Sequence, residues 1–185
     1  IDCDSHVNEP PNLWQERVPA RLRERAPRVE RTDKGDMWIF DGGKGKWPVG
    51  LTTVAGLSFF DYKPMGFTYE TIRPGSFDTK ARLADMDADG IYAQILYPSV
   101  TLKGAKIYSE DRELQTLCVR AYNEWLLEFC SGSGGRLIGL HFFNPVAQMP
   151  LVEVIRGVGT REEEVRKGCA FVTAIDKFPL IVRSC

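Results

Sequence analysis

The chain has 185 residues, of which 43% are hydrophobic and 26% charged, and 24 Lys and Arg residues balance 25 Asp and Glu residues to a net charge of -1. This length fits one globular domain or two small ones. The even mixture of charges argues against nucleic acid or an anionic membrane surface as partner, and no apolar run approaches the roughly 18 residues that cross a bilayer. We expect a cytoplasmic protein that acts on a small molecule, with a homo-oligomer as an open alternative.

Cysteine and histidine content narrows the chemistry. The odd number of cysteines and the absence of a C-x-x-C pair fit free thiols in a reducing cytosol. The chain begins with Ile1 rather than Met and no signal-peptide pattern follows, so we expect its start to be incomplete. Only two histidines occur, His6 and His141. Because most acid/base and transition-metal chemistry uses histidine, each is a candidate functional residue.

The first half of the chain is irregular. Residues 1–6, I-D-C-D-S-H, predict a strand that ends in a polar, proline-containing loop. Residues 20–26 predict a short charged helix, and the runs R-V-E-R and M-W-I-F predict a small hairpin within residues 28–54. Residues 55–75 mix glycine, proline and aromatic residues, which indicates an aromatic loop. Its rings are expected to pack beneath the loop, and a substrate-facing lid is the alternative.

The second half alternates helices and strands, which is typical of the α/β class. The helix that begins near Ser109 keeps its apolar residues, from Leu114 to Phe129, on one face, and Thr160 with Glu163 has the T-x-x-E pattern of a capping box. In chain order we expect a helix over 78–89, a strand over 91–97, the helix from Ser109, strands over 136–143 and 151–156, a helix over 160–174 and a strand over 179–182.

The end of the first strand carries a D-x-H motif. Asp4 and His6 are two residues apart on a strand, so both side chains project from the same face. A carboxylate and an imidazole that converge in this way can share a metal ion. The alternative is an ordinary polar pair at a strand end.

Longer runs around this motif resemble the amidohydrolase superfamily, in the branch that includes aminocarboxymuconate-semialdehyde and resorcylate decarboxylases. The resemblance covers residues 1–140 and rests on I-D-C-D-S-H-V-N-E-P-P-N-L-W, R-L-A-D-M-D-A-D-G-I-Y-A-Q-I-L-Y-P-S and A-Y-N-E-W-L-L-E-F-C. It implies part of a (β/α)8 barrel whose first strand ends in the metal ligands Asp4 and His6. Zinc or manganese would then act on a small carboxylate-bearing substrate, in hydrolysis or decarboxylation.

From residue 136 the sequence resembles a different family, the NAD-dependent 3-hydroxyacyl-CoA dehydrogenases. The resemblance covers residues 136–185 and rests on H-F-F-N-P and P-L-V-E-V-I-R-G. It implies the last strands and one helix of a Rossmann-type nucleotide domain, with His141 as catalytic base, Glu153 as its partner and Asn144 as a polar group beside the substrate. An imidazole oriented by a carboxylate suits the removal of a hydroxyl proton during hydride transfer.

Both resemblances are partial. A (β/α)8 barrel needs about 250 residues, and the G-x-G-x-x-G motif that binds NAD occurs nowhere in the chain. We therefore expect a chimera of two fragments, with an amidohydrolase-like part over 1–140 and a dehydrogenase-like part over 141–185. Three functions follow as hypotheses: a metal-dependent hydrolase or decarboxylase, a fragment of an NAD-dependent 3-hydroxyacyl-CoA dehydrogenase of fatty acid oxidation, and a non-catalytic fragment.

Overall fold

The computed structural model describes residues 1–100, 105–142, 150–156 and 160–183. The chain divides into two compact units, and the boundary crosses helix α3 between Tyr122 and Asn123. Unit 1 comprises residues 1–7, 78–98 and 123–185, and unit 2 comprises residues 8–77 and 99–122.

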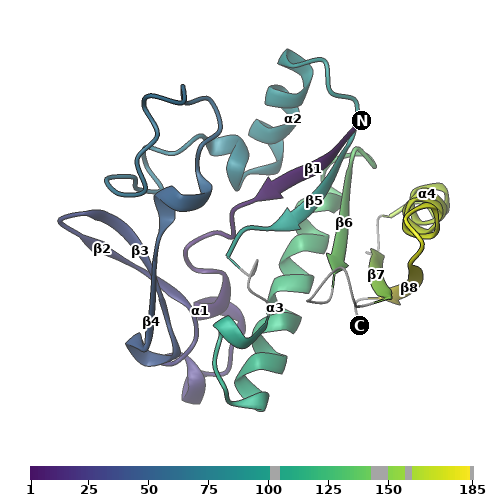
Figure 1. Cartoon of the computed structure of the whole chain (residues 1–185). Helices are drawn as coiled ribbons and strands as arrows, with labels where there is room; N and C mark the ends of the chain where they lie inside the picture. The colour runs from purple at the N-terminus through teal and green to yellow at the C-terminus, as the bar shows by residue number, and fades with distance from the viewer. Residues whose placement is uncertain (101–104, 143–149, 157–159, 184–185) are drawn as a thin grey trace. The chain divides into compact units, whose positions relative to one another are not determined.

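Unit 1 is an open, mixed sheet with helices. Its strands run in the order β1-β5-β6-β7-β8, and β1, β5 and β6 lie side by side in Figure 1. β1, β5 and β6 are mutually parallel, β7 is antiparallel to β6, and β8 is parallel to β7. The elements are β1 (Asp2–Val7), α2 (Thr79–Ala88), β5 (Gln94–Pro98), the second half of α3 (Arg112–Ser131), β6 (Leu137–Phe142), β7 (Leu151–Arg156), α4 (Glu162–Ala174) and β8 (Phe178–Arg183).

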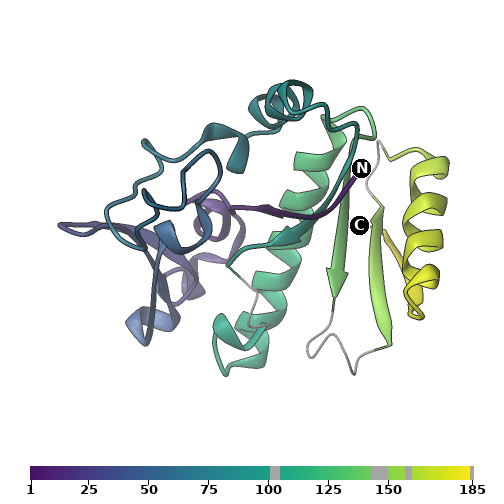
Figure 2. The same cartoon turned by 45° about the horizontal axis from the view of Figure 1, so that its top comes forward.

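Helices α3 and α4 cover opposite faces of β6. A side chain at Gly139 would meet Leu126 of α3, whereas the neighbouring Ile138 packs against the core cluster that contains Val165 and Val172 of α4. Successive strand residues point to opposite faces, so the two helices lie on different sides of the sheet. Figure 2 shows α4, in yellow, alongside β7. This mixed α/β layering is compatible with a Rossmann-like domain.

The predicted partial barrel is not confirmed. Barrel strands are all parallel and their helices form one outer ring, but β7 is antiparallel to β6 and α4 covers the face that a barrel would turn inward. The predicted boundary between an amidohydrolase-like part ending at residue 140 and a dehydrogenase-like part starting at residue 141 remains a prediction. In the structure β6 spans that point, and the compact units divide the chain elsewhere.

Local sequence explains how α2 begins and ends. The Asp78 carboxylate accepts a hydrogen bond from the backbone N–H of Ala81 at 2.8 Å, which caps the first turn. Gly90 has a φ of 69°, in the left-handed region, and allows the chain to leave the helix. The observed helix, Thr79–Ala88, therefore begins and ends one residue inside the predicted range 78–89.

Unit 2 contains a three-stranded antiparallel sheet in the order β2-β3-β4. The predicted hairpin is β2 and β3, and a third strand, β4 (Gly45–Pro48), which was not predicted, pairs with β3. The indole ring of Trp14 packs edge-on against Trp38 and Tyr108, and its N–H donates to the carbonyl of Cys118 at 3.0 Å. The helices and strands are α1 (Leu13–Arg17), β2 (Arg28–Thr32), β3 (Gly35–Phe40), β4 (Gly45–Pro48) and the first half of α3, with 3-10 turns at Ala20–Leu22, Asp41–Gly43, Val49–Thr52, Pro74–Ser76 and Ala105–Ile107.

Two predicted helix starts are wrong by two or three residues. Helix α3 begins at Arg112, because Asp111 rather than Ser109 accepts hydrogen bonds from the first helical N–H groups. Helix α4 begins at Glu162, and Arg161 rather than the predicted Thr160 occupies its N-cap, without a side-chain capping bond of its own. Among the described residues, no helix has the length and apolar character needed to cross a membrane.

Candidate functional site

The structure places the two dehydrogenase-like candidates opposite each other. His141 of β6 and Glu153 of β7 are register partners across an antiparallel ladder, although they are twelve residues apart in sequence. Glu153 is half-buried. Asn144, the third predicted residue of this site, lies outside the described residues. The antiparallel pairing of β6 with β7 therefore places positions 141 and 153 directly opposite each other.

Buried neighbours hold this register. Leu140 and Val154 are the next register pair, and both are essentially inaccessible to solvent. A slip of one residue would move the apolar side chains of a strand to the opposite face, so burial of this pair specifies the alignment. β6 is fixed on its other side by the parallel pairing of Leu96 with Gly139. The positions of the candidate pair thus follow from core packing rather than from a loop.

The D-x-H candidates also lie close together, at the end of β1. The Nε2 atom of His6 is 3.8 Å from Oδ1 of Asp4, and its Nδ1 atom is 3.2 Å from the carbonyl oxygen of Pro98. A carbonyl partner on Nδ1 leaves Nε2 as the coordinating nitrogen. Burial and the nearby acidic groups of Asp4 and Cys3 raise the pKa of Tyr97, whose ring centroid is 5.8 Å from that of His6.

These two side chains do not make a complete metal site. The Asp4 carboxylate is 93% exposed and the His6 side chain 38% exposed, and no cluster of three or more His, Cys, Asp or Glu residues is present in the described part of the chain. A zinc site that does chemistry uses three protein ligands. The predicted divalent metal therefore gains no support, although the predicted pair does converge.

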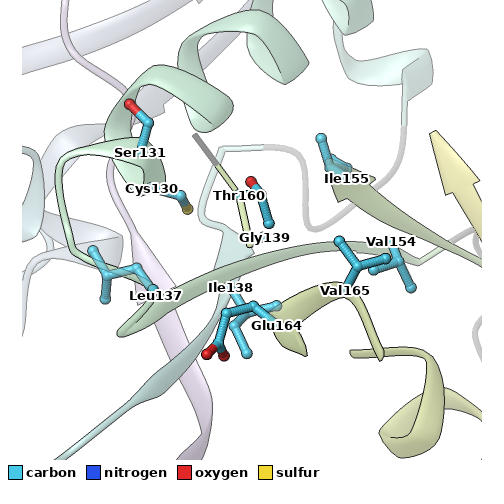
Figure 3. Close-up of a pocket in the computed structure, with 11 residues that line it drawn as sticks. Cys130, Ser131, Leu137, Ile138, Gly139, Val154, Ile155, Thr160, Glu164 and Val165 are labelled. Carbon is cyan, nitrogen blue, oxygen red and sulfur yellow. The ribbon is translucent and has the colours of Figure 1, made fainter. Parts of the chain in front are cut away.

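A small pocket lies near the junction of the two resemblances (Figure 3). Residues of α3, β6, β7 and α4 line it, among them Cys130, Gly139 and Ile155. Its volume is about 30 Å³, which is room for one or two water molecules and far too small for a nucleotide. The lining carboxylate of Glu164 is paired with Arg161 at 2.8 Å and Lys167 at 3.3 Å. This pocket is a packing gap between layers.

The described residues do not fit a dinucleotide. A Rossmann domain binds the pyrophosphate in a glycine-rich turn between a strand and the next helix, with the helix N-terminus pointing at the phosphates. In the described part of unit 1, the glycines with positive φ lie between a helix and a strand: Gly90 before β5, and Gly134 and Gly135 before β6. The first turn of α4 carries three glutamates, Glu162–Glu164, whose charge would repel a pyrophosphate.

Sequence reasoning missed one polar residue of note, Glu9 in unit 2. It falls in the predicted polar loop after the first strand, and its side chain is fully buried. The only feature of the sequence that could have drawn attention to Glu9 is the run H-V-N-E-P-P. Two prolines directly after an acidic residue restrict the conformation of the chain that leaves β1.

Comparison with known proteins supports the dehydrogenase resemblance through a family model, and for the amidohydrolase resemblance it offers a likeness of fold. Residues 127–185 match the family model of the 3-hydroxyacyl-CoA dehydrogenase NAD binding domain. That match begins in the second half of α3, upstream of the predicted start at residue 136, and includes β6, β7, α4 and β8. The C-terminal part of the chain therefore resembles part of an NAD-binding domain.

Among solved structures, an amidohydrolase from Mycobacterium avium subsp. paratuberculosis aligns over 96% of this chain and 46% of its own, with a TM-score of 0.53 and 17% identity. An (S)-3-hydroxybutyryl-CoA dehydrogenase from Ralstonia eutropha aligns over 56% and 38%, with a TM-score of 0.34 and 22% identity. The dehydrogenase part of a multifunctional enzyme from C. elegans aligns over 66% and 27%, with a TM-score of 0.36 and 19% identity. The chain spans less than half the length of each.

Proposed function

We propose that residues 127–185 supply the proton-transfer part of a 3-hydroxyacyl-CoA dehydrogenase site. In this proposal the His141 imidazole accepts the proton of the substrate 3-hydroxyl group, and the Glu153 carboxylate orients the imidazole and stabilises its protonated form. The observation that carries the proposal is the register pairing of His141 with Glu153 inside a segment that matches the family model. Asn144 would contact the substrate, by resemblance.

Hydride transfer would require NAD as the acceptor, and the described residues offer no cradle for that cofactor. What this chain contributes is the recognition of the oxygen on C3 of the acyl chain and the handling of its proton. That contribution can be tested without turnover.

Binding of acetoacetyl-CoA, the 3-keto product, tests the proposal by titration calorimetry on the whole chain. We expect the wild-type chain to bind acetoacetyl-CoA with measurable affinity, and this affinity should fall about tenfold or more in His141→Gln and Glu153→Gln. The first substitution removes the proposed contact to the substrate oxygen, and the second removes the carboxylate that orients the imidazole. Glu162→Gln is the matched control, since Glu162 pairs with Arg156 on the exposed start of α4. Equal affinity of all four proteins, or binding of free CoA as tight as that of acetoacetyl-CoA, would contradict the proposal.

A second candidate is a metal-dependent amidohydrolase-type hydrolase or decarboxylase for a small carboxylate substrate. Two observations favour it: the approach of Asp4 to the Nε2 atom of His6, and the fold likeness to an amidohydrolase over most of the chain. This candidate predicts that dialysed protein retains zinc or manganese in proportion to protein, and that His6→Gln abolishes retention. A non-catalytic fragment predicts neither metal retention nor acyl-CoA binding.

A further inference from the structure

Strand β8, the outermost strand of the unit 1 sheet, has the sequence of an interior strand. Within the described residues it pairs with β7 alone (Figure 1). It reads F-P-L-I-V-R, and Phe178, Leu180 and Ile181 are 70%, 45% and 47% exposed. Val154, the β7 partner of Ile181, packs in the cluster with α4, so Ile181 lies on the face that α4 covers and Leu180 on the opposite face. A strand that is apolar on both faces is typical of the interior of a sheet.

The backbone of β8 presents hydrogen-bonding groups on the edge away from β7. The N–H of Phe178 donates to the carbonyl of Pro150 at 2.7 Å, on the β7 side. Because successive strand residues direct their N–H and C=O groups to opposite edges, the even-numbered residues of β8 face β7 and the odd-numbered residues face outward. Residue 179 is proline and has no N–H, so the outer edge offers donors at Ile181 and Arg183. An extended strand is the partner that matches such alternating donors and acceptors.

The other edge strands of the described sheets carry features that discourage pairing. β1 has two aspartates in the run D-C-D-S-H-V, and its register with β5 shifts between Asp2 and Ser5. β2 reads R-V-E-R-T and β4 reads G-K-W-P, so charged residues occupy both edges of the unit 2 sheet. Charges, prolines and irregular register protect sheet edges from other strands. β8 has such residues only towards its ends, at Pro179 and Arg183, so the described edge of a second copy that matches β8 best is another β8.

We propose that β8 pairs antiparallel with the β8 strand of a second copy, about a two-fold axis at Ile181, and so joins two unit 1 sheets into one. The N–H of each Ile181 then donates to the carbonyl of the partner's Ile181, and the Arg183 N–H donates to the carbonyl of the partner's Pro179. Pro179 selects this register, because an axis centred on proline would leave the middle of the ladder without donors. Leu180 lies opposite the partner's Val182, which removes apolar surface from water. An isologous pair of this kind is closed, so the assembly stops at two chains.

Sedimentation equilibrium of the whole chain tests the association. We expect a reversible monomer–dimer equilibrium in the micromolar range. Ile181→Pro removes the two central donors without touching the β7 side of the strand, and it should raise the dimer dissociation constant about tenfold or more. Ile181→Val is the matched control, because it keeps the N–H and should leave the dissociation constant nearly unchanged. A chain that stays monomeric up to millimolar concentration, open-ended assemblies, or equal dissociation constants for the two variants would overturn the proposal.

Cysteine cross-linking tests the register and remains decisive even if Ile181→Pro does not fold. Two chains are mixed, one with Leu180→Cys and one with Val182→Cys, both carrying Cys3→Ser and Cys185→Ser. In the proposed register, positions 180 and 182 of different copies face each other with Cα atoms about 4.5 Å apart, within the range of a disulfide. Each position lies about 7–8 Å from its own copy across the axis. The oxidised mixture should therefore form covalent dimers much faster than either chain alone, and equal rates or no cross-link would overturn the proposal.

Discussion

Gly139→Ala tests the contact between α3 and β6, at the strand where the two resemblances meet. A Cβ atom at this position would lie 2.8 Å from Cδ2 and 3.1 Å from Cγ of Leu126. Leu126 is fully buried, so its side chain cannot move aside without disturbing the packing of α3. Overpacking of a dense core costs about 1–3 kcal/mol, and we expect a loss of about 2 kcal/mol in the free energy of unfolding.

A double-mutant cycle distinguishes a specific clash from general damage. Leu126→Ala alone should cost about 2–5 kcal/mol, because it leaves a cavity. In the double variant Gly139→Ala/Leu126→Ala the new methyl group enters that cavity, so the combined loss should be smaller than the sum by about 1–2 kcal/mol.

Urea denaturation followed by far-ultraviolet circular dichroism measures all three variants. Gly132→Ala is the control, because its Cβ would lie 3.5 Å from the Thr79 methyl group, an ordinary contact, and it should change stability little. If Gly139→Ala unfolds at the same urea concentration as the wild type, or if the two losses simply add, then α3 does not pack against β6 as described.

Three further predictions concern other parts of the chain. Trp14→Phe should destabilise the protein by about 2–3 kcal/mol in urea denaturation, because it opens a cavity and removes the side-chain donor to the carbonyl of Cys118. At pH 8 a thiol reagent should modify exposed Cys3 rapidly and Cys118 only after unfolding, since burial raises the pKa of Cys118 to about 12; equal rates by mass spectrometry would contradict this. Phe59→Ser/Phe60→Ser should lower binding of a hydrophobic dye and leave stability within about 0.5 kcal/mol, because these rings are 89% and 91% exposed.

Sequence reasoning succeeded where a single local feature decides the structure. Asp78 and Gly90 bound α2 because one caps the helix and the other permits a left-handed φ. Ser109 and Asp111 both offer an oxygen to the first turn of α3, and only the structure shows that Asp111 takes the helical N–H groups. The strand β4 was missed because its partner β3, rather than its own glycine-rich sequence, stabilises it.

The exposure of the aromatic loop was also only partly predictable. The rings of residues 55–75 were expected to pack beneath the loop, and the Tyr69 ring does pack edge-on against Trp38 and Phe77. Phe59 and Phe60, however, contact each other and are almost fully exposed. Composition alone cannot assign rings within a loop to its buried or exposed side, because no regular period relates them.

The two candidate sites differ in how far the sequence alone could predict them. His141 and Glu153 are distant in sequence, and a motif together with strand pairing was needed to relate them. Asp4 and His6 needed only the period of a strand, and the structure places them within 3.8 Å. A third metal ligand would have to come from another element, and a two-residue motif contains no information about it.

The sheet of unit 1 explains how two different resemblances can share one core. In a barrel, the face of β6 that carries Ile138 and Leu140 would point inward and be buried by the other strands. Here α4 and the antiparallel strand β7 bury that face instead, through Val154 and Val165. The opposite face, at Gly139, keeps the α3 contact that suits either architecture. β6 therefore keeps one face against α3, and the residues that follow it in the chain decide what covers the other face.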